Sequence, residues 1–217
     1  MRTRSSVRCA AGIVFFSALV SCVLAQSSGD TQLPAPRTEG GKPLMQVLKE
    51  RKSTRAFSPD KLPLPVLSNL LWAAFGINRE TGQRTAPSAS NRQETDIYVA
   101  TSDGLFIYEA KGHLLRQVLK EDIRALTGTQ DWVKAAPVNL IYVTDLTRGK
   151  RSKPEDIEFY SGAGASFIAE NVYLFCASEG LGTVVRASVD RPALAQAMKL
   201  RSDQKIALAQ SVGYPKK

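Results

Sequence analysis

The segment that most constrains the fold is a long run that is apolar on almost every side of a helix. It reads "EDIEFYSGAGASFIAENVYLFCASEG", and it is apolar nearly all round between Phe167 and Ala177. A helix of this kind needs other elements around it, because its apolar faces would otherwise lie in water. The pattern therefore predicts one long central core helix. Glu170 and Asn171 interrupt the run, and we expect them either to satisfy a buried polar contact or to face a partner subunit.

Helices and strands are mixed along the rest of the chain without a regular alternation. Two β-rich runs flank Ser102-Asp103-Gly104 and predict a hairpin. Gly76 suits the end of one helix, and Asp190 is the expected cap of another. This order, without a glycine-rich turn from strand to helix, predicts an α+β fold rather than a doubly wound sheet. Helical patterns cover 44–49, 65–76, 113–128, 155–180 and 191–199, and strand patterns cover 95–101, 104–110, 136–145, 181–190 and 204–215.

The N-terminus has the composition of an export signal. "MRTRSSVR" is basic, "CAAGIVFFSALV" is apolar but too short to span a bilayer as a mature helix, and "SCVLAQ" ends in small residues. We expect a signal peptide over 1–25, a flexible Ser-, Gly- and Pro-rich leader over 26–42, and one domain over 43–217. The run "LVSC" also resembles a lipoprotein box, which would acylate Cys22 and anchor the protein to a membrane. In either case the protein is expected outside the cytoplasm, in the periplasm or the extracellular space.

Composition excludes several classes of function. The formal net charge of +9 is spread over the chain without a nucleic-acid motif, so no nucleic-acid partner is expected. After cleavage at Ala25 the domain keeps one cysteine, Cys176, and one histidine, His113. These are too few ligands for a His/Cys metal cage, and no intrachain disulfide can form. His113 follows a turn glycine and is expected to be structural. If the protein is an enzyme, a bound cofactor rather than a side chain would therefore supply the reactive group.

A basic cluster, "ERKSTRAF", spans Glu50–Phe57. In an extended segment Arg51, Ser53 and Arg55 would lie on one side, where two guanidinium groups and a hydroxyl could bind a phosphate. Short basic runs also occur as charged surface turns, and composition alone favours that interpretation.

Three further motifs have a functional and an ordinary interpretation. In "APSASNRQ", Ala86–Gln93, the Asn91 amide can donate to and accept from a planar polar ligand, or the stretch can be a surface turn. In "EGLGTVVRAS" the glycines allow a ligand to lie close to the backbone, or Gly180 simply ends the helix. In "VGYPKK" Lys216 follows a strand and could reach an anion, or it belongs to a charged tail.

The order of these motifs is more informative than any one of them. An early R-x-S-x-[RK], a central P-S-x-x-N, a helix ending in G-L-G-T and a final "VGYP" followed by lysine together resemble the flavin-dependent nitroreductase family. The resemblance covers 43–217, and "LLWAAFGINR…RTAPSASNRQ" is most similar to the branch of small nitroreductase-like proteins and azoline dehydrogenases.

The resemblance implies a nitroreductase-like α+β sandwich, with an antiparallel sheet flanked by helices and a long central helix at a homodimer interface. Two FMN molecules would lie in that interface, each contacted by both subunits. The phosphate and ribityl chain would contact the basic cluster and Lys216, the ring edge would contact the Pro-Ser motif, and the ring near N5 would contact the segment after G-L-G-T. The implied cofactor-binding residues are Arg51, Ser53, Arg55, Ser88, Asn91, Val185, Arg186, Ala187, Ser188 and Lys216, with Arg186 either covering the flavin or pointing away.

The implied activity is an FMN-dependent oxidoreductase that transfers hydride through flavin N5 by ping-pong turnover between small molecules. Arg55 or Arg92 would supply a positive charge near N1. Because NAD(P)H is scarce outside the cytoplasm, the flavin could instead oxidise a substrate directly and pass electrons to oxygen or a quinone. A different class also remains open, a non-catalytic exported flavin-binding, anion-binding or interaction protein that keeps the fold.

Overall fold

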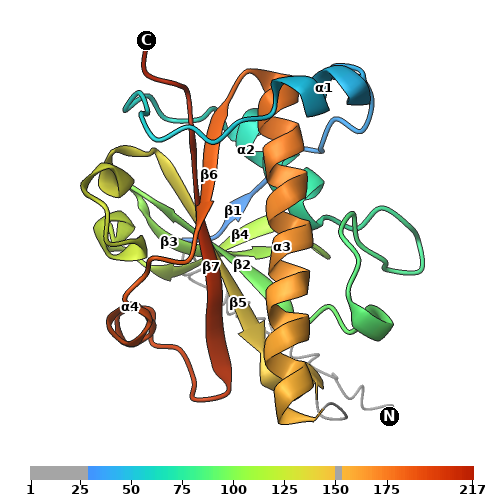
Figure 1. Cartoon of the computed structure of the whole chain (residues 1–217), viewed down its shortest axis with the longest axis vertical. Coiled ribbons are helices and arrows are strands. Elements are labelled where there is room, and N and C mark those ends of the chain that lie inside the picture. Colours follow the sequence, from blue (N-terminus) through green and yellow to red (C-terminus); the bar gives the residue numbers. More distant parts are fainter. Residues whose placement is uncertain (1–28, 150–152) are drawn as a thin grey trace, which may run out of the picture.

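The computed structural model describes residues 29–149 and 153–217, in which one antiparallel sheet is covered on one face by a long helix (Figure 1). The signal peptide expected over 1–25 and the alternative acylation site Cys22 lie outside the described residues. The strand order is β1-β4-β3-β2-β5-β7-β6. The strands are β1 Thr31–Gln32, β2 Thr95–Thr101, β3 Gly104–Glu109, β4 Leu114–Leu119, β5 Val138–Asp145, β6 Gly182–Arg186 and β7 Gln204–Gly213.

Four α-helices accompany the sheet in this part of the chain: α1 Leu44–Glu50, α2 Leu64–Phe75, α3 Pro154–Glu179 and α4 Arg191–Ala197. Short 3-10 turns link them to the strands: η1 Ala89–Asn91, η2 Arg124–Thr127, η3 Asp131–Ala135 and η4 Leu146–Gly149. The predicted α+β class is confirmed. None of the helices described is long and apolar enough to cross a membrane.

The expected central helix is α3, and it is apolar on two sides for different reasons. One side, with Ile168 and Val172, is fully buried against the sheet and α2. The other side leaves Phe159 and Phe167 71% and 50% exposed. The prediction that the helix is buried all round is therefore wrong for a single chain. The helix ends at Gly180, whose left-handed φ of 72° favours glycine.

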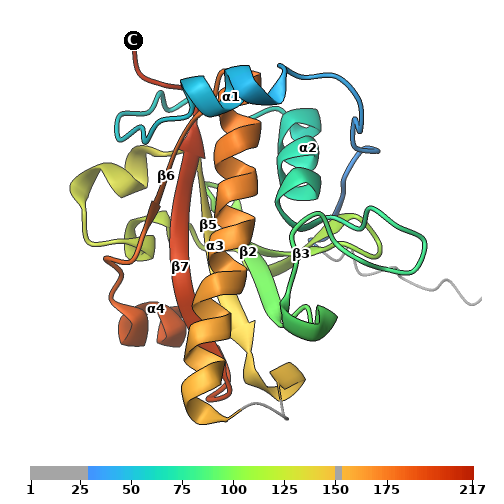
Figure 2. The same ribbon diagram turned by 45° about the vertical axis from the view of Figure 1, so that its right-hand side comes forward.

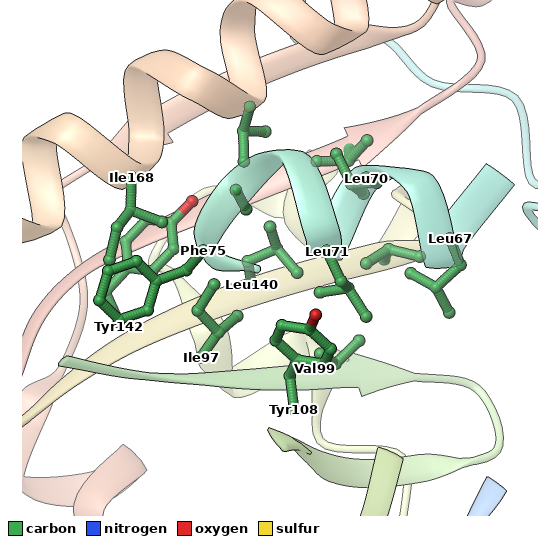
Figure 3. Close-up of a cluster of buried hydrophobic side chains, with 14 of the residues drawn as sticks. Leu67, Leu70, Leu71, Phe75, Ile97, Val99, Tyr108, Leu140, Tyr142 and Ile168 are labelled. Carbon is green, nitrogen blue, oxygen red and sulfur yellow. The ribbon is translucent and has the colours of Figure 1, made fainter. Parts of the chain in front are cut away.

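The main core lies between α2, α3 and one face of the sheet (Figure 3). Alternation along the strands separates it from a second core on the other face, because Ile97 and Val99 of β2 enter the first while Tyr98 enters the second with Leu194 of α4. All eight residues of β5 are buried, since this strand lies inside the sheet and is covered on both faces.

The helix predicted over 113–128 is wrong. Its first half is β4, which pairs with β3, and its second half contains η2. Leu114, Leu115, Val118 and Leu119 have helical spacing, but pairing with β3 outweighs that local preference. The predicted hairpin at 95–110 and the Asp190 cap are confirmed, and the Asp190 carboxylate accepts from the Ala193 amide at 3.1 Å.

The leader expected to be flexible over 26–42 is ordered in its described part. β1 pairs with β4, and Leu33 is 3% exposed within the main core. Arg37 forms an ion pair with Glu179 at the end of α3, at 2.7 Å. A Ser-, Gly- and Pro-rich composition does not prevent an extended strand from pairing with the free edge of a sheet, and that edge is available only in the folded protein.

Candidate functional site

The basic cluster lies along the outer edge of β6, the last strand of the sheet. After α1 ends, the chain becomes extended, and Ser53 forms a parallel bridge with Thr183. The Thr54 amide donates to the Thr183 carbonyl at 2.9 Å. The cluster therefore occupies a sheet edge that would otherwise expose unpaired backbone groups.

The C-terminus meets the same segment. Phe57 bridges Pro215, and the Lys216 amide donates to the Ala56 carbonyl at 3.0 Å. Lys216 is thus placed beside the residue that follows Arg55, although the two cations lie at opposite ends of the domain sequence. The structure brings together these two predicted parts of the phosphate site.

Tyr173 of α3 links three of the predicted residues. Its hydroxyl lies 2.9 Å from Ser53 Oγ and accepts from the Val185 amide at 3.0 Å. The Arg51 guanidinium lies over its ring, 5.1 Å from the centroid. Either hydroxyl can be the donor between Tyr173 and Ser53, and when Tyr173 donates, the serine hydrogen is left for a ligand. Sequence analysis missed Tyr173, although a tyrosine inside an apolar helix needs a partner for its hydroxyl.

A cavity of about 400 Å³ opens between the end of α1, the last turns of α3 and the start of β6. Its wall includes Lys52, Thr54, Tyr173, Thr183 and Pro215. Among the described residues no acidic side chain pairs with Lys52, Arg55 or Lys216. Of these three cations Lys52 lines the cavity, beside the ion pair of Lys42 with Glu50, while Arg55 and Lys216 lie on the adjoining segments. A cation without an acidic partner favours an anionic ligand.

Arg186 points away from this cavity. Its guanidinium donates to Ser211 Oγ at 2.9 Å, to the Thr127 carbonyl at 2.9 Å and to Asn139 Oδ1 at 3.1 Å. It also lies over the Trp132 ring on that side of the sheet, 5.7 Å from the centroid. Burial lowers the pKa of Arg186 to about 10. Of the two orientations expected, the structure has the one pointing away, so the Arg186 side chain is not a contact on the cavity side.

Beyond Arg186 the backbone of the expected ring-binding segment is accessible. Ala187 and Ser188 are exposed, and Val185 is half-buried against the main core. The Ser188 carbonyl accepts from the Thr129 amide at 3.2 Å, which holds the segment against the turn after η2. The four predicted residues 185–188 therefore continue the edge that the basic cluster begins.

Ser88 and Asn91 do not join the other predicted residues within one chain. Their loop, 77–93, lies on one side of α3, and the basic cluster and β6 lie on the other (Figures 1 and 2). Both views agree on this separation. A site that used all the predicted residues would therefore need a second copy of the chain.

Gln93 organises that loop and was not singled out from the sequence. Its backbone amide donates to Ser88 Oγ at 2.9 Å, and its side chain donates to Asn91 Oδ1 at 3.0 Å. Arg84 donates to Gln93 Oε1 at 2.8 Å and to the Phe75 carbonyl at the end of α2 at 2.9 Å. Because the Asn91 oxygen is occupied, the Asn91 side-chain nitrogen remains to donate to a ligand.

The comparisons with known proteins cover both parts of this arrangement. The model of the nitroreductase family matches residues 48–214. A nitroreductase-like protein from Methanocaldococcus jannaschii is 34% identical over 167 residues, which are 72% of this chain and 84% of that protein.

Solved structures agree. A nitroreductase-like protein from Ralstonia eutropha superposes with a TM-score of 0.84 at 43% identity, over 87% of this chain and 90% of that one. The NADPH:FMN oxidoreductase from Vibrio harveyi, solved with NAD⁺, shares the fold with a TM-score of 0.60 at 16% identity, over 80% of this chain and 69% of that one. Sequence and fold lead to the same conclusion: the chain belongs to the nitroreductase family of oxidoreductases.

Proposed function

We propose that this protein is an FMN-dependent oxidoreductase whose flavin binds between two copies of the chain. The observation that carries the proposal is the edge of β6, where Arg51–Arg55 and Lys216 lie at the start of the strand and the exposed residues Ala187 and Ser188 follow its end. Family membership supports the flavin, as does the FMN oxidoreductase from Vibrio harveyi that shares the fold.

The residues at the upper end of this edge fit a phosphate group. A phosphate monoester carries more than one negative charge near neutral pH and offers strong acceptor oxygens. Arg55 and Lys216 have no acidic partner among the residues described, and Ser53 Oγ is held 2.9 Å from the Tyr173 hydroxyl. Arginine forks and a serine hydroxyl form charge-assisted hydrogen bonds with such oxygens. We therefore assign the phosphate to this end and the ring to 185–188.

A homodimer would complete the site. The large exposed apolar residues include Leu44, Met45 and Leu48 of α1 and Phe159 and Phe167 of α3, between 46% and 76% exposed. α1 and α3 share one face of the molecule (Figure 2). If α3 packs against α3 of a second copy around a two-fold axis, the partner's copy of the 77–93 loop crosses to the β6 side. Ser88 and Asn91 would then approach the flavin that the first copy holds by its phosphate.

The chain's own groups position the cofactor and shape access to it. Bound FMN would supply the chemistry, accepting hydride at N5 from a donor and passing it to an acceptor that enters the same pocket. The Tyr173 hydroxyl bonds both Ser53 and Val185. One side chain would therefore position a residue for the phosphate and a residue for the ring. Gln93 directs the Asn91 amide nitrogen toward the ligand. Preorganised contacts of this kind avoid reorganisation when the reaction occurs.

We also propose that the protein acts outside the cytoplasm, because residues 1–25 have the composition expected of an export signal. The electron donor would then be an organic substrate rather than NAD(P)H, with oxygen or a quinone as acceptor. An absorption spectrum of loaded protein during exposure to candidate donors would identify the class that bleaches the flavin.

The first test is the visible spectrum of the mature domain after addition of FMN and desalting. We expect a yellow band that persists in the wild type and is lost in Arg51→Ala/Arg55→Ala, with the far-UV circular dichroism unchanged. Arg116→Ala/Arg201→Ala is the matched control, because it removes two exposed arginines elsewhere on the surface. Folded wild-type protein without retained FMN would refute the function, and FMN retained by the first variant would refute the phosphate assignment.

A further inference from the structure

Arg186 is a buried cation without a buried anion. It is 8% exposed, and every hydrogen bond it makes goes to a neutral group: Ser211 Oγ, Asn139 Oδ1, and the carbonyl and hydroxyl of Thr127. Its Nε has no hydrogen-bond partner among the residues that the structure describes. None of the ion pairs in the described parts of the chain includes it.

Such an arrangement is unfavourable for the protein alone. Taking a guanidinium out of water costs more than hydrogen bonds to neutral groups recover, and a packed apolar side chain of similar volume is often as stable or more so. The lowered pKa of Arg186 reflects this cost, yet the group stays protonated near neutral pH. The Trp132 ring adds a cation–π contact, but no counter-charge among the described residues compensates the buried guanidinium.

The position of the charge relative to the proposed flavin site offers an explanation. Side chains alternate along β6, so Val185 packs on the α3 side while Val184 packs with Trp132 on the side that Arg186 enters. Arg186 directly precedes the exposed residues Ala187 and Ser188. The charge therefore lies behind the strand whose front and edge we assign to the ring.

We propose that Arg186 stabilises the reduced, anionic form of FMN across β6 and so raises the reduction potential of the bound flavin. This inference rests on the proposed function. Transfer of one hydride from the organic donor adds two electrons and one proton to oxidised FMN, so the reduced ring carries one negative charge that the oxidised ring lacks. A fixed positive charge behind the strand favours the reduced form over the oxidised form.

Burial makes the charge effective. Exposed cations such as Arg55 are screened by water and salt, whereas a charge inside the protein acts through a low dielectric. A unit charge roughly 12 Å away, at an effective dielectric constant of about 20, changes the ratio of binding constants about tenfold. For a two-electron couple, a tenfold change corresponds to about 30 mV. Arg186 is a positioning and electrostatic residue in this scheme, because it does not contact the flavin.

The test compares FMN-loaded Arg186→Met and Arg186→Lys with the wild type by equilibrium reductive titration against a dye of known potential. We expect Arg186→Met to bind oxidised FMN with nearly unchanged affinity, to bind reduced FMN about tenfold more weakly and to shift the potential about 30 mV negative. Its apoprotein should melt at the wild-type temperature or above it. The reduction potential of FMN in Arg186→Lys should stay close to the wild-type value.

Arg124→Met is the matched control, since Arg124 lies in the neighbouring η2 but is paired with Asp122 at 2.8 Å. It removes the same formal charge, and we expect no shift in potential. If Arg186→Met does not fold, Arg186→Gln, which keeps hydrogen-bonding capacity without charge, replaces it. A neutral variant with the wild-type potential would overturn the inference and leave the proposed function standing. Wild-type protein that retains no FMN would overturn both.

Discussion

Removal of the Tyr173 hydroxyl tests whether α3 positions the residues of the proposed site. Tyr173→Phe keeps the ring under the Arg51 guanidinium but removes the hydrogen bonds to Ser53 and Val185. A hydrogen bond contributes about 1 kcal/mol net, so loss of both should lower the free energy of unfolding by roughly 1–3 kcal/mol. The share that orients Ser53 is about 1 kcal/mol, which predicts a roughly fivefold increase in the FMN dissociation constant.

Urea unfolding of the apoprotein and quenching of FMN fluorescence on titration measure the two quantities separately. Tyr160→Phe is the control, because Tyr160 lies on the same helix but is 37% exposed and no hydrogen bond to its hydroxyl is seen among the described residues. We expect this control to match the wild type in both assays. If Tyr173→Phe also binds FMN with wild-type affinity, then Ser53 is not held for the phosphate by α3.

Two further predictions concern assembly and pH. Phe167→Glu places a charge on the exposed apolar side of α3, so sedimentation should show a monomer that no longer retains FMN; a dimer that persists would exclude this side of α3 from the interface. Burial lowers the pKa of His113 from its ordinary value of 6.5, so the unfolded chain binds the proton more tightly and stability falls as pH decreases below about 6.5. Urea unfolding at about pH 7.5 and about pH 5.5 should show this fall in the wild type and a smaller one in His113→Gln, and equal falls would refute the assignment.

Some elements follow from local sequence because neighbouring residues decide them. The hairpin needs only a turn at Ser102-Asp103-Gly104, the short helix α4 needs a cap at Asp190, and α3 ends where Gly180 adopts a left-handed backbone. The motifs that predict the site were also recognised from their order along the chain. For the hairpin, the Asp190 cap and the end of α3, the physical cause lies within a few residues of its effect.

Other features were mispredicted because partners distant in sequence decide them. The leucines of β4 have helical spacing, yet pairing with β3 makes a strand, and the leader is ordered because β4 offers it an edge. Gln93 and Tyr173 escaped notice for a related reason. Tyr173 acts through Ser53, 120 positions away, whereas Gln93 bonds Asn91 and Ser88 of its own motif but is oriented by Arg84 and by the folded loop.

By itself the sequence determined the class of fold, the long central helix and the residue types that could bind an anionic cofactor, since these depend on apolar spacing and on side-chain chemistry. Only the tertiary structure decided that Lys216 meets the basic cluster, that Ser88 and Asn91 lie across α3 from it, and that Arg186 enters the interior. The reason is that strand order, and the alternation of side chains along each strand, set which residues share a surface. Both arise from pairing between distant segments, which composition and spacing along the chain do not encode.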